Sequence, residues 1–87
     1  MKVRNMTNAK GRAIPNQFIL TDDNGNEIFQ SYKTIIAKKG KPVLLDRDSW
    51  DYSRTTSKYR NQFLGETTKE TKRKIADGTY KLVDLND

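Results

Sequence analysis

The stretch "WDYSRTTSKYRNQFLGETTKETKRKIADG", residues 50–78, contains two segments with helical spacing on either side of Gly65. In the first segment, four side chains recur at intervals of four, three and four residues, and this spacing places them on one face of a helix: Tyr52, Thr56, Tyr59 and Phe63. Ser53 is a suitable N-cap, and Gly65 suits the position just after the last turn. The sequence therefore predicts a helix over residues 53–64 that packs through its aromatic face.

The second segment carries the start and stop signals of another helix. Thr67 and Glu70 have the spacing of a capping box, and Asp77-Gly78 is a typical helix end. Its apolar side is small, because Ile75, with Thr71 one turn before it, makes up nearly all of it. We expect a short helix that leans on the domain and adds little to its core.

The remaining sequence has the spacing of strands and turns. Asn24-Gly25 between two apolar runs is a strong hairpin signal, and Gly40 marks a second turn. The predicted strands cover residues 16–21, 27–31, 33–38, 43–46 and 79–85. The order β-β-β-β-α-α-β predicts an α+β fold, a small single domain with an antiparallel sheet of about four to five strands and two short helices.

The length and composition limit what this domain can be. A chain of 87 residues with 33% hydrophobic side chains supports one small domain with a thin core, here residues 1–87. Residues 1–12 are expected as either a flexible basic arm or a solvated terminus. The N-terminus lacks the apolar segment of a signal peptide, and no stretch approaches the roughly 20 apolar residues of a membrane span. We expect a cytoplasmic protein with no membrane partner.

The chain has no Cys and no His, which removes thiol nucleophiles, the usual general base and the usual zinc ligands. Asp46, Asp48 and Asp51 offer oxygen ligands that could hold Mg²⁺. They also precede a predicted helix, whose N-terminal dipole favours negative charge, and this second interpretation is preferred. We therefore expect no enzymatic activity, no cofactor, no metal site and no small-molecule substrate.

The charge of the chain indicates the class of partner. Seventeen Lys and Arg against eleven Asp and Glu give a net charge of +6, which attracts polyanions or acidic proteins. The balance of charge is uneven along the chain, since residues 1–21 contain four Lys and Arg and no acid. One surface can therefore be strongly basic while another is not.

The outward side of the two predicted helices carries cationic and amide side chains. Such groups bind phosphate oxygens, and Arg, Asn and Gln also read base edges. Exposed helix faces often carry the same residue types for solubility alone, which is the alternative interpretation. The candidate nucleic-acid-binding residues are Arg54, Lys58, Arg60, Asn61, Gln62, Lys72, Arg73 and Lys74.

A helix-turn-helix unit is a further interpretation of two helices joined by a Gly-containing turn. That motif needs apolar residues in the turn and early in the second helix. Glu66 and Lys72 occupy the nearest equivalent positions, so the sequence argues against it.

Several stretches together carry a family resemblance: "NAKGRAIPNQFIL", "FQSYKTIIA", "WDYSRTTSKYRNQFLGETTKE" and "IADGTYKLVDLN". With them the chain resembles a small, functionally uncharacterised family encoded by phages of Gram-positive bacteria and related mobile elements. The resemblance covers nearly the whole chain and is most specific at residues 50–53 and 58–61. It implies a phage or mobile-element origin and a bacterial cytoplasm, and it implies no activity.

Three functional hypotheses follow. The first is a non-enzymatic accessory protein that binds nucleic acid, DNA before RNA, through its basic helical face. The alternative is an inhibitor that binds a host protein, a ribonucleoprotein or an antiviral defence complex in the manner of an anti-CRISPR protein. Its interface would use Trp50, Tyr52 and Tyr32, although we expect Trp50 to be buried. The third is a structural phage component that self-assembles.

Overall fold

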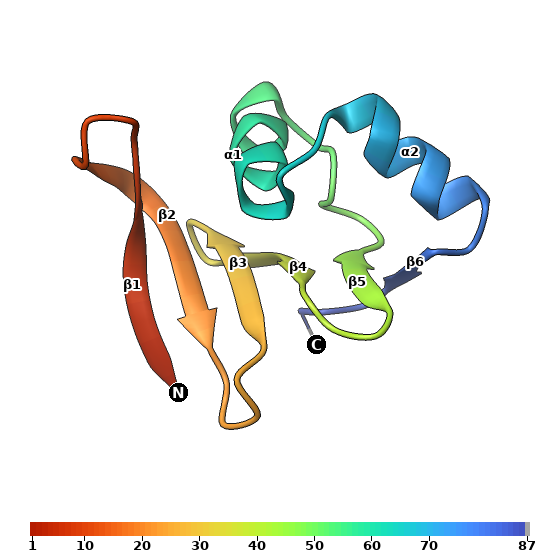
Figure 1. The fold of residues 1–87 in the computed structure, drawn as a ribbon, viewed down its shortest axis with the longest axis horizontal. Coiled ribbons are helices and arrows are strands. Elements are labelled where there is room, and N and C mark those ends of the chain that lie inside the picture. The colour runs from red at the N-terminus through yellow and green to blue at the C-terminus, as the bar shows by residue number, and fades with distance from the viewer. Residues whose placement is uncertain (87) are drawn as a thin grey trace.

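The computed structural model describes residues 1–86, which form six strands and two helices (Figure 1). In chain order these are β1 (Lys2–Thr7), β2 (Ala13–Thr21), β3 (Glu27–Ser31), β4 (Thr34–Lys38), β5 (Val43–Asp46), α1 (Arg54–Leu64), α2 (Thr68–Ala76) and β6 (Tyr80–Val83). The α+β class is confirmed, with one strand more than the upper limit that we predicted. Neither helix in the described residues is long and apolar enough to cross a membrane.

All six strands form one sheet, in which spatial order follows chain order from β1 to β6. Neighbouring strands are antiparallel as far as β5, and β6 then pairs with β5 in parallel. A parallel pair needs a long crossover connection, and here that connection contains both helices. The sheet is therefore mixed, which corrects the expectation of an antiparallel one. Figure 1 shows both helices on the same side of it.

The N-terminal residues form a strand in place of the expected arm. β1 pairs with β2 in antiparallel register, from Lys2 opposite Thr21 to Asn5 opposite Phe18. Met6 is buried, so this strand contributes to the core. Most residues of β1 are polar or cationic, so the sequence predicts this strand only weakly. The strand is stabilised by its hydrogen bonds to β2.

Both helix termini follow the predicted chemistry. The Ser53 side chain accepts a hydrogen bond from the Thr56 backbone N–H at 3.1 Å. Gly65 adopts the left-handed conformation, with φ of 70°, that lets its N–H donate to the Asn61 carbonyl. In α2, Thr67 and Glu70 form the complete capping box. These local signals are confirmed because they depend only on residues a few positions apart.

The core lies between the helices and one face of the sheet. A row of side chains aligned across four strands forms its floor: Ile19, Phe29, Ala37 and Leu45. The Phe63 ring of α1 packs on the Phe29 ring, with 5.8 Å between the centroids. Trp50 packs against this core but is only partly buried.

The opposite face of the sheet is also apolar. Val3, Leu20 and Ile28 are aligned across three strands, and Phe18 lies in the next row. Val3 is 64% exposed and the others are half-buried. Neither helix covers this face, which we call the open face (Figure 1). The uncovered side of an antiparallel sheet is ordinarily polar.

Candidate nucleic-acid interface

The outer side of α1 carries an exposed row of polar and basic side chains. Arg54, Lys58 and Gln62 follow one another at intervals of one helical turn, and all three are exposed. Among residues 1–86, neither Arg54 nor Lys58 has an acidic partner within ion-pair distance. The Lys58 ammonium lies 5.3 Å from the centre of the Tyr59 ring, and the side chain as a whole is exposed. These three predicted residues therefore form one surface.

A tertiary contact extends this surface to the N-terminal hairpin. The Gln62 side-chain amide donates to the Thr7 carbonyl at 2.9 Å. Thr7 begins the connection to β2, which carries the exposed cations Lys10 and Arg12. The Asn8 side chain accepts from the backbone N–H groups of both and so holds the turn. We call the combined surface the basic strip: Arg54, Lys58, Gln62, Lys10 and Arg12.

Lys10 and Arg12 were not among the candidate residues. The sequence indicated that the segment of residues 1–21 is basic, because it contains no acid. It did not indicate which other part of the chain lies beside this segment in the fold. Only the contact between Gln62 and Thr7 brings that segment to α1.

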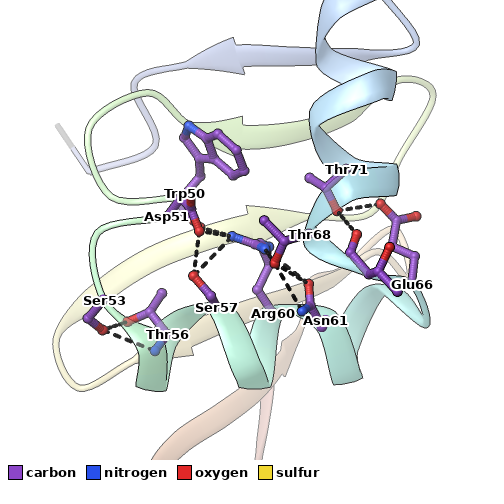
Figure 2. Close-up of polar contacts among 11 residues, drawn as sticks. Trp50, Asp51, Ser53, Thr56, Ser57, Arg60, Asn61, Glu66, Thr68 and Thr71 are labelled. Atoms are coloured by element: carbon purple, nitrogen blue, oxygen red, sulfur yellow. Dashed lines mark hydrogen bonds and ion pairs between the residues drawn. The ribbon is translucent and has the colours of Figure 1, made fainter.

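Arg60 lies inside the protein, which corrects its expected position on the basic face. Its side chain is 0% exposed. Figure 2 shows the polar contacts that it makes inside the protein. One terminal nitrogen donates to the Trp50 carbonyl at 2.5 Å and to Asp51 at 3.0 Å, and the other donates to Thr68 and Asn61. The guanidinium also lies 5.0 Å from the Trp50 ring. Arg60 thus joins α1, α2 and the loop before them and cannot reach an external ligand.

The inward row of α1 explains this difference. The buried residues of the helix are Thr56, Arg60 and Phe63, whereas Tyr59 is half-buried. Its hydrophobic ring favoured Tyr59 for the inner position. The hydrogen-bond acceptors around residue 60 instead suit a buried guanidinium, because a guanidinium can donate to them and an aromatic ring cannot.

Asn61 is engaged within the protein as well. Its amide nitrogen donates to the Thr68 hydroxyl at 3.1 Å, and its oxygen accepts from Arg60 at 3.0 Å (Figure 2). The side chain is half-buried between the two helices. Both ends of its amide are therefore engaged in contacts within the protein, which corrects the expected outward position of a base reader.

The three cations predicted on α2 have different environments. Lys72 is exposed and forms no ion pair with the described residues. Arg73 pairs with Asp77 at 3.7 Å, and Lys74 pairs with Glu66 at 2.7 Å. Of these three predicted cations, only Lys72 is therefore unpaired with the described residues.

Glu66 connects α2 to β6 through a buried carboxylate. Its side chain is 4% exposed and accepts hydrogen bonds from Lys74, Thr71 at 2.5 Å and Tyr80 at 2.6 Å. Burial by itself raises the pKa of Glu66, but these hydrogen bonds outweigh it and hold the pKa below the ordinary value of 4.5. The group is a structural anion at neutral pH.

The acidic residues before α1 also have structural partners. Asp46 accepts hydrogen bonds from the Ser49 and Leu85 backbone N–H groups. Asp51 accepts from Arg60 and from the Ser57 hydroxyl. These contacts account for both carboxylates as turn and helix-start residues, the interpretation that the sequence favoured over a metal site.

A groove lies beside the basic strip, between the N-terminal hairpin and the end of α1. Its volume is about 260 Å³, and its walls include the side chains of Arg4, Glu27, Lys39 and Gln62. Gln62 therefore belongs both to the groove and to the basic strip.

Comparison with known proteins gives a family and no function. No curated protein and no solved structure matches the chain. The model of a family of unknown function (DUF8033) matches residues 1–78, which include both helices and every strand except β6. The chain therefore belongs to this family of unknown function.

Proposed function

We propose that this protein is a non-enzymatic nucleic-acid-binding protein whose basic strip contacts phosphate groups. The observation that carries the proposal is the hydrogen bond from Gln62 to Thr7, because it joins two acid-free basic segments into one surface. Four cations of this strip have no carboxylate partner among residues 1–86: Lys10, Arg12, Arg54 and Lys58. Unpaired surface cations of this kind are the usual ligands of phosphate oxygens.

The proposed mechanism is electrostatic attraction followed by release of counterions. A net charge of +6 steers a polyanion toward the protein, and the strip orients it. Phosphate contacts carry little sequence information, so we expect weak sequence preference. The chain has no His or Cys to act on the bound strand, so its role is binding without chemistry.

Salt dependence tests the proposal directly. Contacts from four cations predict a plot of log affinity against log salt concentration with a slope of about −3 for single strands and about −4 for duplex. Fluorescence anisotropy of labelled DNA, titrated at KCl concentrations from about 50 to about 200 mM, measures this slope. Lys58→Gln and Arg12→Gln should each lower its magnitude by about one.

The matched control is Lys81→Gln, which removes one exposed charge from β6, at the opposite edge of the sheet from β1. Its slope should equal that of the unaltered protein. A flat salt response, or equal effects of Lys81→Gln and Lys58→Gln, would contradict binding through the basic strip.

The open face supports a second candidate, a protein-directed inhibitor of a host factor or of a defence complex. Leu20, Ile28 and Leu44 share their row with the exposed Lys81, so the partner that fits is an apolar surface with an acidic neighbour. Capture of a bacterial protein that survives nuclease, is lost in Ile28→Lys and persists in Lys58→Gln would favour this role. Both candidates act in a bacterial cytoplasm, in keeping with the resemblance to phage-encoded proteins.

A further inference from the structure

The groove between the N-terminal hairpin and α1 has an apolar floor. Met6, Ile19 and Phe63 line it, and each of these side chains is less than a tenth exposed. Its volume of about 260 Å³ is just below the range of about 300–1,000 Å³ that holds drug-sized ligands. The space therefore suits one flat ring system better than a large cofactor.

The rim of the groove is charged and rich in hydrogen-bonding groups. Glu27 accepts from Arg4 at 3.1 Å and from Lys39 at 3.4 Å, one at each carboxylate oxygen. The Lys39 ammonium also lies 4.6 Å from the centre of the Phe63 ring. The hydrogen bond from Arg4 is the main cause that lowers the pKa of Glu27, so this group is a carboxylate at neutral pH. Two cations and one anion leave the rim with one net positive charge.

Acceptors and one planar cation face the same space. Each Glu27 oxygen keeps a second lone pair, and the Gln62 side-chain oxygen accepts no hydrogen bond from the described residues. The exposed Arg4 guanidinium is planar and can stack on an aromatic ring. Amino groups on the edge of a nucleobase are donors that match these acceptors.

We infer that this groove receives one unpaired nucleobase of a single strand whose phosphates lie along the basic strip, a role that rests on the proposed function. Gln62 connects the two parts, because it lines the groove and belongs to the strip. In a duplex the bases stay stacked and paired and cannot reach the floor without being flipped out. The groove therefore favours single-stranded nucleic acid, with cytosine, adenine or guanine as the inserted base.

Two matched strands test the inference without altering the protein. One probe is a fluorescein-labelled strand of eight abasic deoxyribose phosphates, and the other is the same strand with a single cytosine at its centre. The backbone charge is the same in both, so any difference in affinity comes from the base. Anisotropy titrations at about 20 mM KCl should show that the cytosine strengthens binding by at least about fivefold.

Two variants locate the effect. Arg4→Gln removes one charge at the groove, and Lys81→Gln removes one charge at the far edge of the sheet. The fivefold advantage of the cytosine strand should fall below about twofold in Arg4→Gln and remain in Lys81→Gln. Both positions are exposed, so neither change should unfold the protein.

The other outcomes are distinguishable. Equal binding of the two strands overturns the inference and leaves the proposed function standing. An advantage that persists in Arg4→Gln also overturns it, because the base is then held elsewhere. Absence of binding to both strands at low salt overturns the proposed function and the inference with it.

Discussion

Arg60 is the residue whose location matters most to the stability of the helical half of the protein. A buried guanidinium is costly unless its donors are satisfied, and five acceptors surround its two terminal nitrogens, whereas its Nε has no partner among the described residues. They belong to the loop before α1, to α1 itself and to the first turn of α2. One side chain therefore joins three segments of the helical half.

Removing this side chain should destabilise the protein severely. We expect Arg60→Ala to lower the free energy of unfolding by about 3 kcal/mol, because it leaves the Trp50 carbonyl without its donor and Asp51 without its cation. The control Arg54→Ala, on the exposed side of the same helix, should change it by less than about 0.5 kcal/mol. Urea unfolding followed by circular dichroism measures both. Similar effects of the two changes would contradict the role given to Arg60.

Tyr32 has a backbone conformation that its side chain disfavours. Its φ is 55°, in the left-handed region, although its side chain is 56% exposed and contributes little packing. The tight connection between β3 and β4 imposes this conformation.

Relief of this strain should stabilise the protein. We expect Tyr32→Gly to raise the free energy of unfolding by about 0.5–1 kcal/mol, because glycine adopts positive φ without a steric penalty. Tyr52, which is 55% exposed and has no positive φ, is the matched control, and Tyr52→Gly should lower the free energy by a similar amount. Thermal unfolding curves compare the two, and a loss of stability in Tyr32→Gly would contradict the strain.

At the scale of elements, α2 is attached to the sheet mainly by polar contacts. Thr71 is its only buried residue, and Ile75 is half-buried. Glu66, just before the helix, bonds to Thr71 and Lys74 within it and to Tyr80 in β6. The attachment therefore depends on one carboxylate and on its charge.

Glu66→Gln should show this dependence. We expect a loss of about 2 kcal/mol in the free energy of unfolding at pH 7, because charge-assisted hydrogen bonds become neutral ones. The folded pKa of Glu66 is lowered, so its contribution is present above the unfolded pKa and is lost as pH falls through the folded pKa. The difference between variant and unaltered protein should thus shrink at pH 3.

The control for this experiment is Glu70→Gln. Glu70 is exposed, and glutamine can also complete a capping box, so the effect should be small at both pH values. Urea midpoints at pH 7 and pH 3 measure all three proteins. A constant deficit of Glu66→Gln across this range would contradict the role of its charge.

For the whole molecule, we expect the free energy of unfolding to fall in acid and to stay constant near neutral pH. Among residues 1–86, seven carboxyl groups have pKa values held below their ordinary values by hydrogen bonds and cations: Asp22, Glu27, Asp46, Asp51, Glu66, Glu70 and Asp77. A carboxyl group whose pKa is lower in the folded protein than in the unfolded chain stabilises the fold at any pH above its unfolded pKa, which is near 4. This stabilisation is lost as the pH falls through the folded pKa. The chain contains no His to titrate between pH 5.5 and 7.

Urea unfolding at three pH values checks this expectation. The midpoint should be the same at pH 7 and pH 5.5 and clearly lower at pH 3. A fall between pH 7 and pH 5.5 would show that a group other than these carboxylates controls the stability.

Features that depend on nearby residues can be predicted from the amino-acid sequence of this protein. The strands at 27–31 and 43–46, the Ser53 and Thr67 caps and the left-handed Gly65 all follow from local spacing and backbone preference. The outward position of Arg54 and Lys58 follows from helical periodicity. Local geometry is enough for such features because their hydrogen bonds lie within a few residues of one another.

Which charges are unpaired and which segments adjoin depends instead on contacts between distant parts of the chain. Burial of Arg60 depends on acceptors from the loop before α1 and from α2, and β1 depends on a partner strand. The link from Gln62 to Thr7 spans residues distant in the chain, so no local pattern could reveal it. The physical reason is that a charge is paired or exposed according to its neighbours in space, and folding alone brings those neighbours together.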